Sequence, residues 1–263
     1  MNLNLDKSCA DGYISSSQIA RVLTEGWVKK NSYCPSCGNE YLNSFKNNAP
    51  VADFICSSCK SEYELKSKKN SFTLKIVDGA YQTMIQRINS ENNPHFFFLN
   101  YSLQTLVVHN FLVIPNHYFI DNIIEKRKPL SEKAVRAGWI GCNILLQNIP
   151  SSGKIFLVKD GRIKKRENVI ETWARTAFLG GQKKESRGWT IEILKVIEKI
   201  SENEFNLKQV YQFENDLKKI FPNNDFVRDK IRQQLQILRE KGLLEFKGNG
   251  LYKKVGSSDF SVG

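Results

Sequence analysis

Residues 53–66 read DFICSSCKSEYELK, and this stretch decides how the chain is expected to fold. Side chains alternate between the two faces of a β-strand, so a strand through "EYELKS" places Glu64 and Lys66 on one face. Asp53 lies on the other side of a pair of cysteines. If the cysteine turn is the tip of a hairpin, Asp53 and Glu64 sit on adjoining strands. The stretch therefore predicts two carboxylates and an amine at one place on a sheet.

These three side chains have two interpretations. One is an exposed strand face with a modest salt bridge between Glu64 and Lys66, which is common. The other is a phosphodiesterase site, in which Asp53 and Glu64 bind one Mg²⁺ with the Leu65 carbonyl as a further oxygen ligand. Lys66 could then reach the attacking water or a phosphate oxygen, while the metal polarises the phosphate. The Asp-x(n)-Glu-x-Lys pattern is loose, and the cysteines inside it make it more specific.

Four of the six cysteines form two C-x-x-C pairs separated by 18 residues, namely Cys34, Cys37, Cys56 and Cys59. Each C-x-x-C turn presents two thiolates to one point, so two turns complete a tetrahedron around Zn²⁺. Since protein ligands fill all four positions, the predicted zinc is structural. A redox role for one pair is the alternative. The two remaining cysteines, Cys9 and Cys142, are expected to be packing residues.

The chain has 263 residues and a formal net charge of +12. Such a charge indicates a polyanionic partner, with nucleic acid as the first candidate, although anionic membrane surfaces also attract basic proteins. No stretch approaches the roughly 18 apolar residues of a membrane span. The start "MNLNLDKSCADGY" has no apolar signal-peptide core. We therefore expect a cytoplasmic protein without a membrane partner.

Strand and helix patterns alternate up to about residue 180, which indicates an α/β or α+β core. Strands are expected at "VADFIC", "EYELKS", "HFFFLNYS", "VVHNFLVIP" and "GKIFLVKDG", and helices at "SSSQIARVLTEGWVKK" and "DGAYQTMIQRINS". The two apolar runs "HFFFLNYS" and "VVHNFLVIP" are typical of central strands in a covered sheet. The Gly-, Gln- and Lys-rich "LGGQKKESRGW" then predicts a linker.

Three helical patterns and a hairpin follow, which together describe a winged helix. The helices are expected at "TIEILKVIEKI", "NLKQVYQFENDLKKIF" and "DFVRDKIRQQLQILREKG", and the hairpin at "LLEFKGNGLYKK". In the third helix, Arg suits guanine and Gln suits adenine in the major groove. The candidate base-contacting residues are Arg228, Arg232, Gln233 and Gln236, although an ordinary basic surface helix explains any one of them as well. The lysines of the wing, Lys247, Lys253 and Lys254, are expected to contact phosphate.

Two further residues are candidates for the site. Trp139 lies between glycines in "RAGWIGCNI", where it could stack on bases or cover a methyl group. A buried loop anchor is an equal alternative. Glu25 belongs to a polar stripe on the first helix and could add a carboxylate to the metal site, but a solvated helix face explains it as well.

The sequence resembles the PD-(D/E)xK nuclease superfamily, and within it the methyl-directed type IIM restriction endonucleases. The similar stretches run from about residue 15 to residue 254 and include "LTEGWV", "YCPSCGN", "PVADFIC", "ELKSKK", "DGAY", "RAGWIGCNI", "SRGWTIEIL" and "IRQQLQILR". The resemblance implies that Asp53, Glu64 and Lys66 are catalytic and that Trp139 contacts DNA. The proline of the signature stands at Pro50 rather than next to the aspartate.

That resemblance implies a PD-(D/E)xK nuclease domain with an inserted four-cysteine zinc site at 1–182 and a winged helix at 183–263. The expected activity is Mg²⁺-dependent hydrolysis of double-stranded DNA at GATC containing N6-methyladenine. We expect a monomer. No nucleotide cofactor is expected either, because no G-x-x-x-x-G-K-[ST] motif occurs.

A competing hypothesis is a non-catalytic zinc-ribbon and winged-helix regulator of transcription. It explains the cysteines and the charge, but not the grouping of Asp53, Glu64 and Lys66. An RNA-directed nuclease is also compatible with the site chemistry, although a major-groove helix would add nothing to it.

Overall fold

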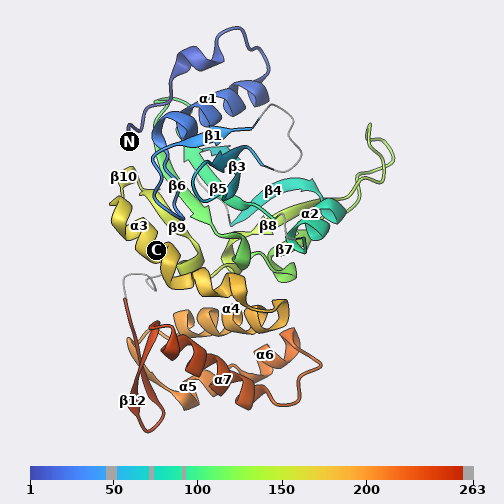
Figure 1. Ribbon diagram of the computed structural model, residues 1–263. Helices are drawn as coiled ribbons and strands as arrows, with labels where there is room; N and C mark the ends of the chain where they lie inside the picture. The colour runs from blue at the N-terminus through green and yellow to red at the C-terminus, as the bar shows by residue number, and fades with distance from the viewer. Residues whose placement is uncertain (46–51, 71–73, 91–92, 257–263) are drawn as a thin grey trace. The chain divides into compact units, whose positions relative to one another are not determined.

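The computed structural model describes residues 1–45, 52–70, 74–90 and 93–256 (Figure 1). The chain forms two compact units. The first contains residues 1–147 and 153–174, and the second contains residues 148–152 and 175–263.

The first unit is built on a seven-stranded sheet in the order β1-β2-β3-β5-β6-β9-β10. Its strands are β1 (Leu42–Ser44), β2 (Phe54–Cys56), β3 (Glu62–Lys69), β5 (His95–Tyr101), β6 (Val108–Ile114), β9 (Ile155–Lys159) and β10 (Arg162–Ile163). β3 runs parallel to β5, and the other neighbouring strands are antiparallel. The predicted hairpin of β2 and β3 is confirmed, with its tip at the second C-x-x-C pair.

The core lies around the central strand β5, whose residues from Phe96 to Tyr101 are all buried. Helices α1 (Ser16–Asn31) and α3 (Arg166–Thr176) pack on one face, where Trp27 and Trp173 share a core with Phe97. Phe96 packs against Phe119 with the ring centroids 4.4 Å apart. A strand buried on both sides needs a continuous apolar run, so the pattern "HFFFLNYS" predicted this position correctly.

A second sheet of the first unit has the order β4-β8-β7. It consists of β4 (Lys75–Ala80), β7 (Ile124–Lys126) and β8 (Gly141–Leu145). Helix α2 (Tyr81–Ile88) follows β4 directly in the chain. The helix predicted at "DGAYQTMIQRINS" is present, but its first three residues belong to β4. Residues 75–80 pair with β8 instead, and the helix begins only at Tyr81, whose N–H donates to the Ile140 carbonyl.

The second unit contains α4 (Lys184–Lys199), α5 (Leu207–Tyr211), α6 (Glu214–Ile220), α7 (Val227–Glu240) and a sheet of β11 (Glu204–Asn206), β13 (Leu251–Lys254) and β12 (Leu244–Gly248). Its own core includes Trp189, Ile193, Ile197 and Leu235. The predicted hairpin of β12 and β13 is confirmed, and it turns through a Gly-Asn-Gly stretch whose middle residue, Asn249, has a φ of +48°.

Two predictions for this unit need correction. The expected linker is mostly helical, because α4 begins within it at Lys184. Trp189 at the end of the linker belongs to the same buried stripe of α4 as Ile193 and Ile197. The expected single helix over "NLKQVYQFENDLKKIF" is split into α5 and α6. The Phe213 N–H bonds to the Val210 carbonyl, so the tighter 3₁₀ pattern ends the α-helical ladder there.

The remaining elements are 3₁₀ turns, namely η1 (Lys7–Ala10), η2 (Asn116–Tyr118), η3 (Asp121–Ile123), η4 (Leu146–Asn148), η5 (Ser151–Gly153) and η6 (Ala177–Gly181). Over the described parts of the chain, none of the helices has both the length and the apolar character needed to cross a bilayer.

Candidate functional site

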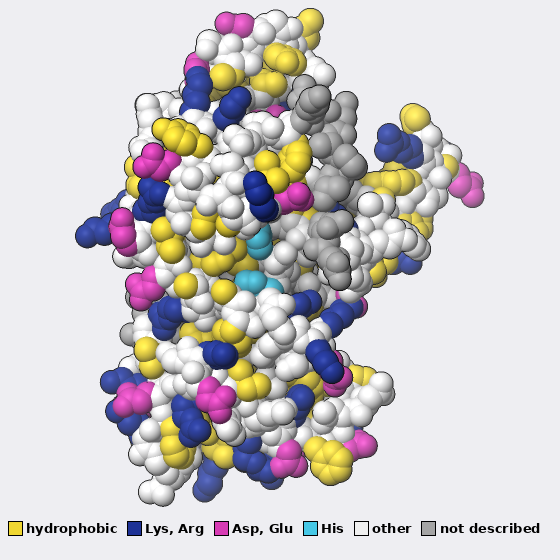
Figure 2. Space-filling view, in the orientation of Figure 1, with side chains coloured by type: hydrophobic (Ala, Val, Ile, Leu, Met, Phe, Trp, Pro, Cys, Tyr) yellow, Lys and Arg dark blue, Asp and Glu magenta, His cyan; other side chains and the backbone are white. Residues whose placement is uncertain are grey.

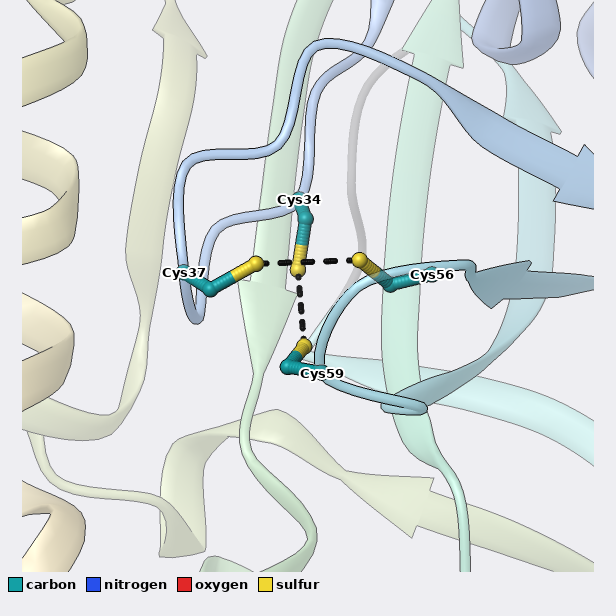
Figure 3. A group of neighbouring side chains, drawn as sticks. All are labelled: Cys34, Cys37, Cys56 and Cys59. Carbon is teal, nitrogen blue, oxygen red and sulfur yellow. Dashed lines mark hydrogen bonds between the residues drawn. The ribbon is translucent and has the colours of Figure 1, made fainter.

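The four paired cysteines converge on one point beside the edge of the large sheet (Figure 3). The Sγ atoms of Cys34 and Cys59 are 3.5 Å apart, those of Cys37 and Cys56 are 3.6 Å apart, and all four lie within 4.8 Å of one another. A tetrahedral zinc with Zn–S bonds of about 2.3 Å would hold its sulfurs about 3.8 Å apart. The cluster can therefore hold a zinc ion, as its spacing in the sequence predicted.

The two cysteine turns have the same backbone structure. In each, the residue after the second cysteine is left-handed, Gly38 with a φ of +78° and Lys60 with a φ of +62°. Their N–H groups donate to the carbonyls of Cys34 and Cys56, at 2.8 and 3.0 Å. At Gly38 a Cβ would come within 2.7 Å of the end of the Ile170 side chain, so glycine suits both the left-handed backbone and the close packing of the first turn.

The cysteine cluster is connected to the strand that carries the predicted site. Tyr63 of β3 is buried, and its hydroxyl lies 3.0 Å from the Cys34 Sγ. The Tyr63 ring also stacks on Phe97 of β5, with centroids 4.5 Å apart. Since Tyr63 directly precedes Glu64, the contact with the sulfur cluster fixes the β3 backbone next to Glu64.

Charged side chains of β3, β4, α2 and the residue just before β2 meet on the other face of β3. The Lys66 ammonium lies 2.6 Å from Glu64 Oε1 and 2.5 Å from Asp78 Oδ1. Arg87 Nη1 lies 2.6 Å from Glu64 Oε2. Asp53, just before β2, accepts a hydrogen bond from the Leu65 N–H at 2.6 Å. The structure thus brings Asp53, Glu64 and Lys66 together, as the sequence suggested.

Burial and mutual repulsion shape the ionisation of the carboxylates. Burial raises the pKa of Asp53, and the neighbouring Glu64 adds to this, although the Leu65 N–H opposes it. Burial also raises the pKa of Glu25 on α1, where Arg21 opposes the shift and Asp53 adds to it. Glu25 is therefore close enough to Asp53 for the two charges to interact. Buried carboxylates that repel one another favour a cation between them.

Sequence reasoning missed two members of this cluster, Asp78 and Arg87. Asp78 lies on β4 of the smaller sheet and Arg87 lies on α2, so their contacts with β3 depend on how these elements pack and not on strand alternation within β3. Asp78 Oδ2 and Arg87 Nη2 are buried without a hydrogen bond among the described residues, whereas Glu64 Oε2 lies in the ion pair with Arg87 Nη1. The stretch "DGAY" was the sole signal for Asp78. Pro50 lies outside the described residues.

Trp139 lies in a long hairpin loop, residues 127–140, that joins β7 to β8 and extends away from the rest of the first unit (Figure 1). The loop is mostly exposed, and Val135 at its far end is fully exposed. Trp139 itself is half-buried, and its ring lies against Gly141, where a Cβ would come within 2.8 Å of it. The tryptophan therefore anchors the loop and keeps part of its ring at the surface.

In the second unit, the four candidate residues of α7 are all exposed. Arg228 donates to Glu214 and lies over the Tyr211 ring, and Arg232 donates to the Tyr211 hydroxyl at 2.7 Å. Such surface contacts contribute little and can exchange for contacts with another molecule. In Figure 2 the Lys and Arg side chains are spread over this unit with acidic side chains between them.

One prediction for the wing was wrong. Lys254 is buried, and its ammonium donates to the Ile200 carbonyl at the end of α4. Burial lowers its pKa. Lys254 therefore closes the end of a helix and cannot contact phosphate, whereas Lys247 is exposed and pairs with Glu245 at 2.7 Å.

Comparison with known protein families agrees with this arrangement. Residues 1–182 match the family model of DpnI, described as the Dam-replacing family, and residues 185–254 match the Dam-replacing HTH domain, DpnI_C. These matches place the protein among the restriction endonucleases, with a helix-turn-helix domain that binds DNA. The chain belongs to the DpnI, or Dam-replacing, family. The resemblance to a restriction endonuclease with a C-terminal winged helix is thereby confirmed.

Proposed function

We propose that this protein is a Mg²⁺-dependent, methyl-directed type II restriction endonuclease that cuts double-stranded DNA at GATC containing N6-methyladenine. The observation that carries the proposal is the convergence of Asp53, Glu64 and Lys66 on one face of β3. A DNA-binding regulator would have no need to bury such a cluster, because buried charges are costly unless they serve a purpose. Family membership supports the same activity.

The residues present fit a hard divalent cation. Asp53 and Glu64 supply carboxylate oxygens, and a cation between them would relieve the burial and repulsion that raise the pKa of Asp53. We assign Asp53, Glu64 and the Leu65 carbonyl as the Mg²⁺ ligands, with Glu25 as a further carboxylate. When bound, the metal would polarise the phosphate and lower the pKa of a water. Lys66 would orient that water or bind a phosphate oxygen.

We assign residues 1–182 to a PD-(D/E)xK nuclease domain with structural Zn²⁺ and residues 183–263 to a winged-helix DNA-binding domain. Recognition helices enter the major groove, where Arg228, Arg232, Gln233 and Gln236 can read base edges. Trp139 of the first unit would make a second contact with the site. The protein would act on methylated duplex DNA as a monomer.

Reading the methyl group twice has a physical advantage. Burial of one methyl group contributes only about 1 kcal/mol, or about a five-fold preference. Two independent readings, one by each domain, would raise the preference to about 30-fold. This gives a reason for one chain to carry both a winged helix and a nuclease domain that contacts bases.

The substrate prediction follows directly. A plasmid from a host that methylates adenine in GATC should be cut in the presence of Mg²⁺, and the same plasmid from a non-methylating host should stay intact. Gel electrophoresis with and without chelator measures both requirements. Equal cutting of the two plasmids would disprove methyl direction but leave the nuclease assignment standing, and cutting in excess chelator would disprove the metal requirement.

The winged helix should separate base reading from phosphate binding. We expect Gln233→Ala to reduce the preference for methylated GATC over other duplexes by about 1–3 kcal/mol, because a paired contact to adenine is lost. Lys247→Ala should instead weaken binding to all duplexes alike and reduce the slope of affinity against salt by about 1.

Fluorescence anisotropy at several salt concentrations measures both effects. Lys219→Ala on α6, which removes an exposed lysine paired with Asp216, is the matched control. If Gln233→Ala lost affinity equally for methylated GATC and for unrelated duplexes, α7 would not read the sequence.

A further inference from the structure

Asp78 holds the proposed catalytic lysine from a different sheet. Its Oδ1 lies 2.5 Å from the Lys66 ammonium, which is also 2.6 Å from Glu64 Oε1. Glu64 is also paired with Arg87, and it is one of the residues that we assign as ligands of the metal. Asp78 is therefore the partner that can keep Lys66 in place while Glu64 serves the metal.

We propose that Asp78 is a positioning residue that fixes Lys66 and couples it, through strand β8, to the loop that carries Trp139. The inference rests on the proposed function and deepens it, because it assigns a route from DNA contact to the reacting centre. Asp78 need not touch DNA, and its action is through the lysine.

The backbone around Asp78 is built to aim this side chain. The pairing of β4 with β8 shifts register between Asp78 and Ala80, which is a β-bulge. Bulges redirect side chains and are frequent beside active sites. The Gly79 N–H donates to Asp78 Oδ1 at 2.7 Å, and the buried Cys142 thiol lies 3.4 Å from the Gly79 carbonyl. The Gly79 N–H thus holds the Asp78 carboxylate, and β8 contacts the Gly79 backbone in turn.

The same strand leads directly to the exposed loop. In the register of β4 and β8, Asp78 lies opposite Cys142 and Ala80 lies opposite Gly141. Trp139 packs its ring on Gly141. Trp139 itself is only three residues before Cys142 in the chain. A movement of Trp139 when DNA binds would therefore shift the start of β8 and, across one pair of residues, the bulge that aims Asp78.

The first test compares Asp78→Asn with Glu125→Gln. Glu125 of β7 contacts Lys75 of β4 and Asn143 of β8, so it links the three strands of the smaller sheet. No contact of Glu125 with Lys66 is present among the described residues. Under single turnover with saturating enzyme, Asp78→Asn should cut methylated duplex about 100-fold more slowly, the cost of a misplaced catalytic group. Its affinity for that duplex in Ca²⁺ and its thermal midpoint should stay near wild type, and Glu125→Gln should change none of the three.

The second test measures coupling with a double-mutant cycle. Independent residues give rate losses that multiply, whereas residues on one route do not. We expect Asp78→Asn combined with Trp139→Ala to cut no more than about three-fold slower than the slower single variant. A multiplicative loss would overturn the coupling. Unchanged cleavage by Asp78→Asn would overturn the positioning role.

A third measurement does not depend on cleavage. In ¹⁵N-lysine-labelled protein that keeps its zinc but is free of Mg²⁺, the Lys66 ammonium held by two carboxylates should exchange slowly with water, and Asp78→Asn should speed this exchange. Fast exchange in the wild type would contradict the proposal. If the wild type cuts no DNA, the nuclease assignment fails, yet the exchange rate still decides whether Asp78 holds Lys66. Cutting without regard to methylation would overturn the substrate, and the rate ratio of Asp78→Asn to wild type would still apply.

Discussion

Glu64→Gln is expected to slow DNA cleavage by about 1,000-fold, within the range expected when a positioned catalytic group is lost. The variant keeps the shape of the side chain and an oxygen that can accept from Lys66, which lies 2.6 Å away. What it removes is the negative charge that would bind Mg²⁺ and balance Arg87. Asp53→Ala and Lys66→Ala should be equally severe, because each removes a metal ligand or the amine near the phosphate.

Cleavage of a methylated GATC duplex under single turnover measures the rate, and gel shift in Ca²⁺ measures binding. Binding should persist, since the winged helix is untouched. Glu62→Gln is the matched control, because it makes the same chemical change two residues earlier on the same face of β3. Near-normal cleavage by any one of the three variants would remove that residue from the site, whereas a loss in Glu62→Gln of the same size would indicate damage to the strand.

The part of the site formed by Asp53, Glu64 and Lys66 could be predicted because these residues belong to one hairpin, whose tip is marked by the second C-x-x-C pair. Glu64 and Lys66 share a strand face by simple alternation. The cysteine turn between Asp53 and Glu64 reverses the chain, so a hairpin there is almost dictated by its zinc spacing. The structure agrees, since Asp53 bonds to the Leu65 N–H across that hairpin.

Asp78 and Arg87 could not be predicted in the same way. Their positions depend on the pairing of β4 with β8. These two strands are more than sixty residues apart in the sequence. Alternation in "KIVDGA" is interrupted by the bulge, so the sequence pattern favoured a helix beginning at Asp78. Long-range strand pairing and bulges are set by tertiary packing, and a single sequence carries little trace of them.

The helical start of the second unit was hidden for a related reason. The stretch "LGGQKKESRGW" has the composition of a linker, yet Gly188 and Trp189 are buried within α4. Composition averages over both faces of a helix. The one buried face, with Trp189 stacked on Phe221 at 4.0 Å, decides the structure.

Loss of the zinc ligands is expected to have the largest effect on stability. Cys34→Ser should release the metal and lower the midpoint of thermal unfolding by about 10 °C or more. A loss of 1 kcal/mol shifts the midpoint by about 2–4 °C in a domain of this size, and a structural zinc contributes several kcal/mol. The first turn would lose its metal, and the contact between Tyr63 and Cys34 would be lost with it. Cleavage should fall as well, because Tyr63 precedes Glu64 on β3.

Cys9→Ser provides the matched control, since Cys9 packs near Gly26 outside the cluster. It should retain one zinc per chain by elemental analysis and unfold close to the wild-type midpoint. Chelator should lower the wild-type midpoint toward that of Cys34→Ser and have no further effect on Cys34→Ser itself. Wild-type protein purified without chelator but free of zinc, or a Cys34→Ser variant as stable as Cys9→Ser, would contradict a structural zinc. In that case the sulfur contacts and the core around Tyr63 alone would have to hold the hairpin that carries Asp53 and Glu64.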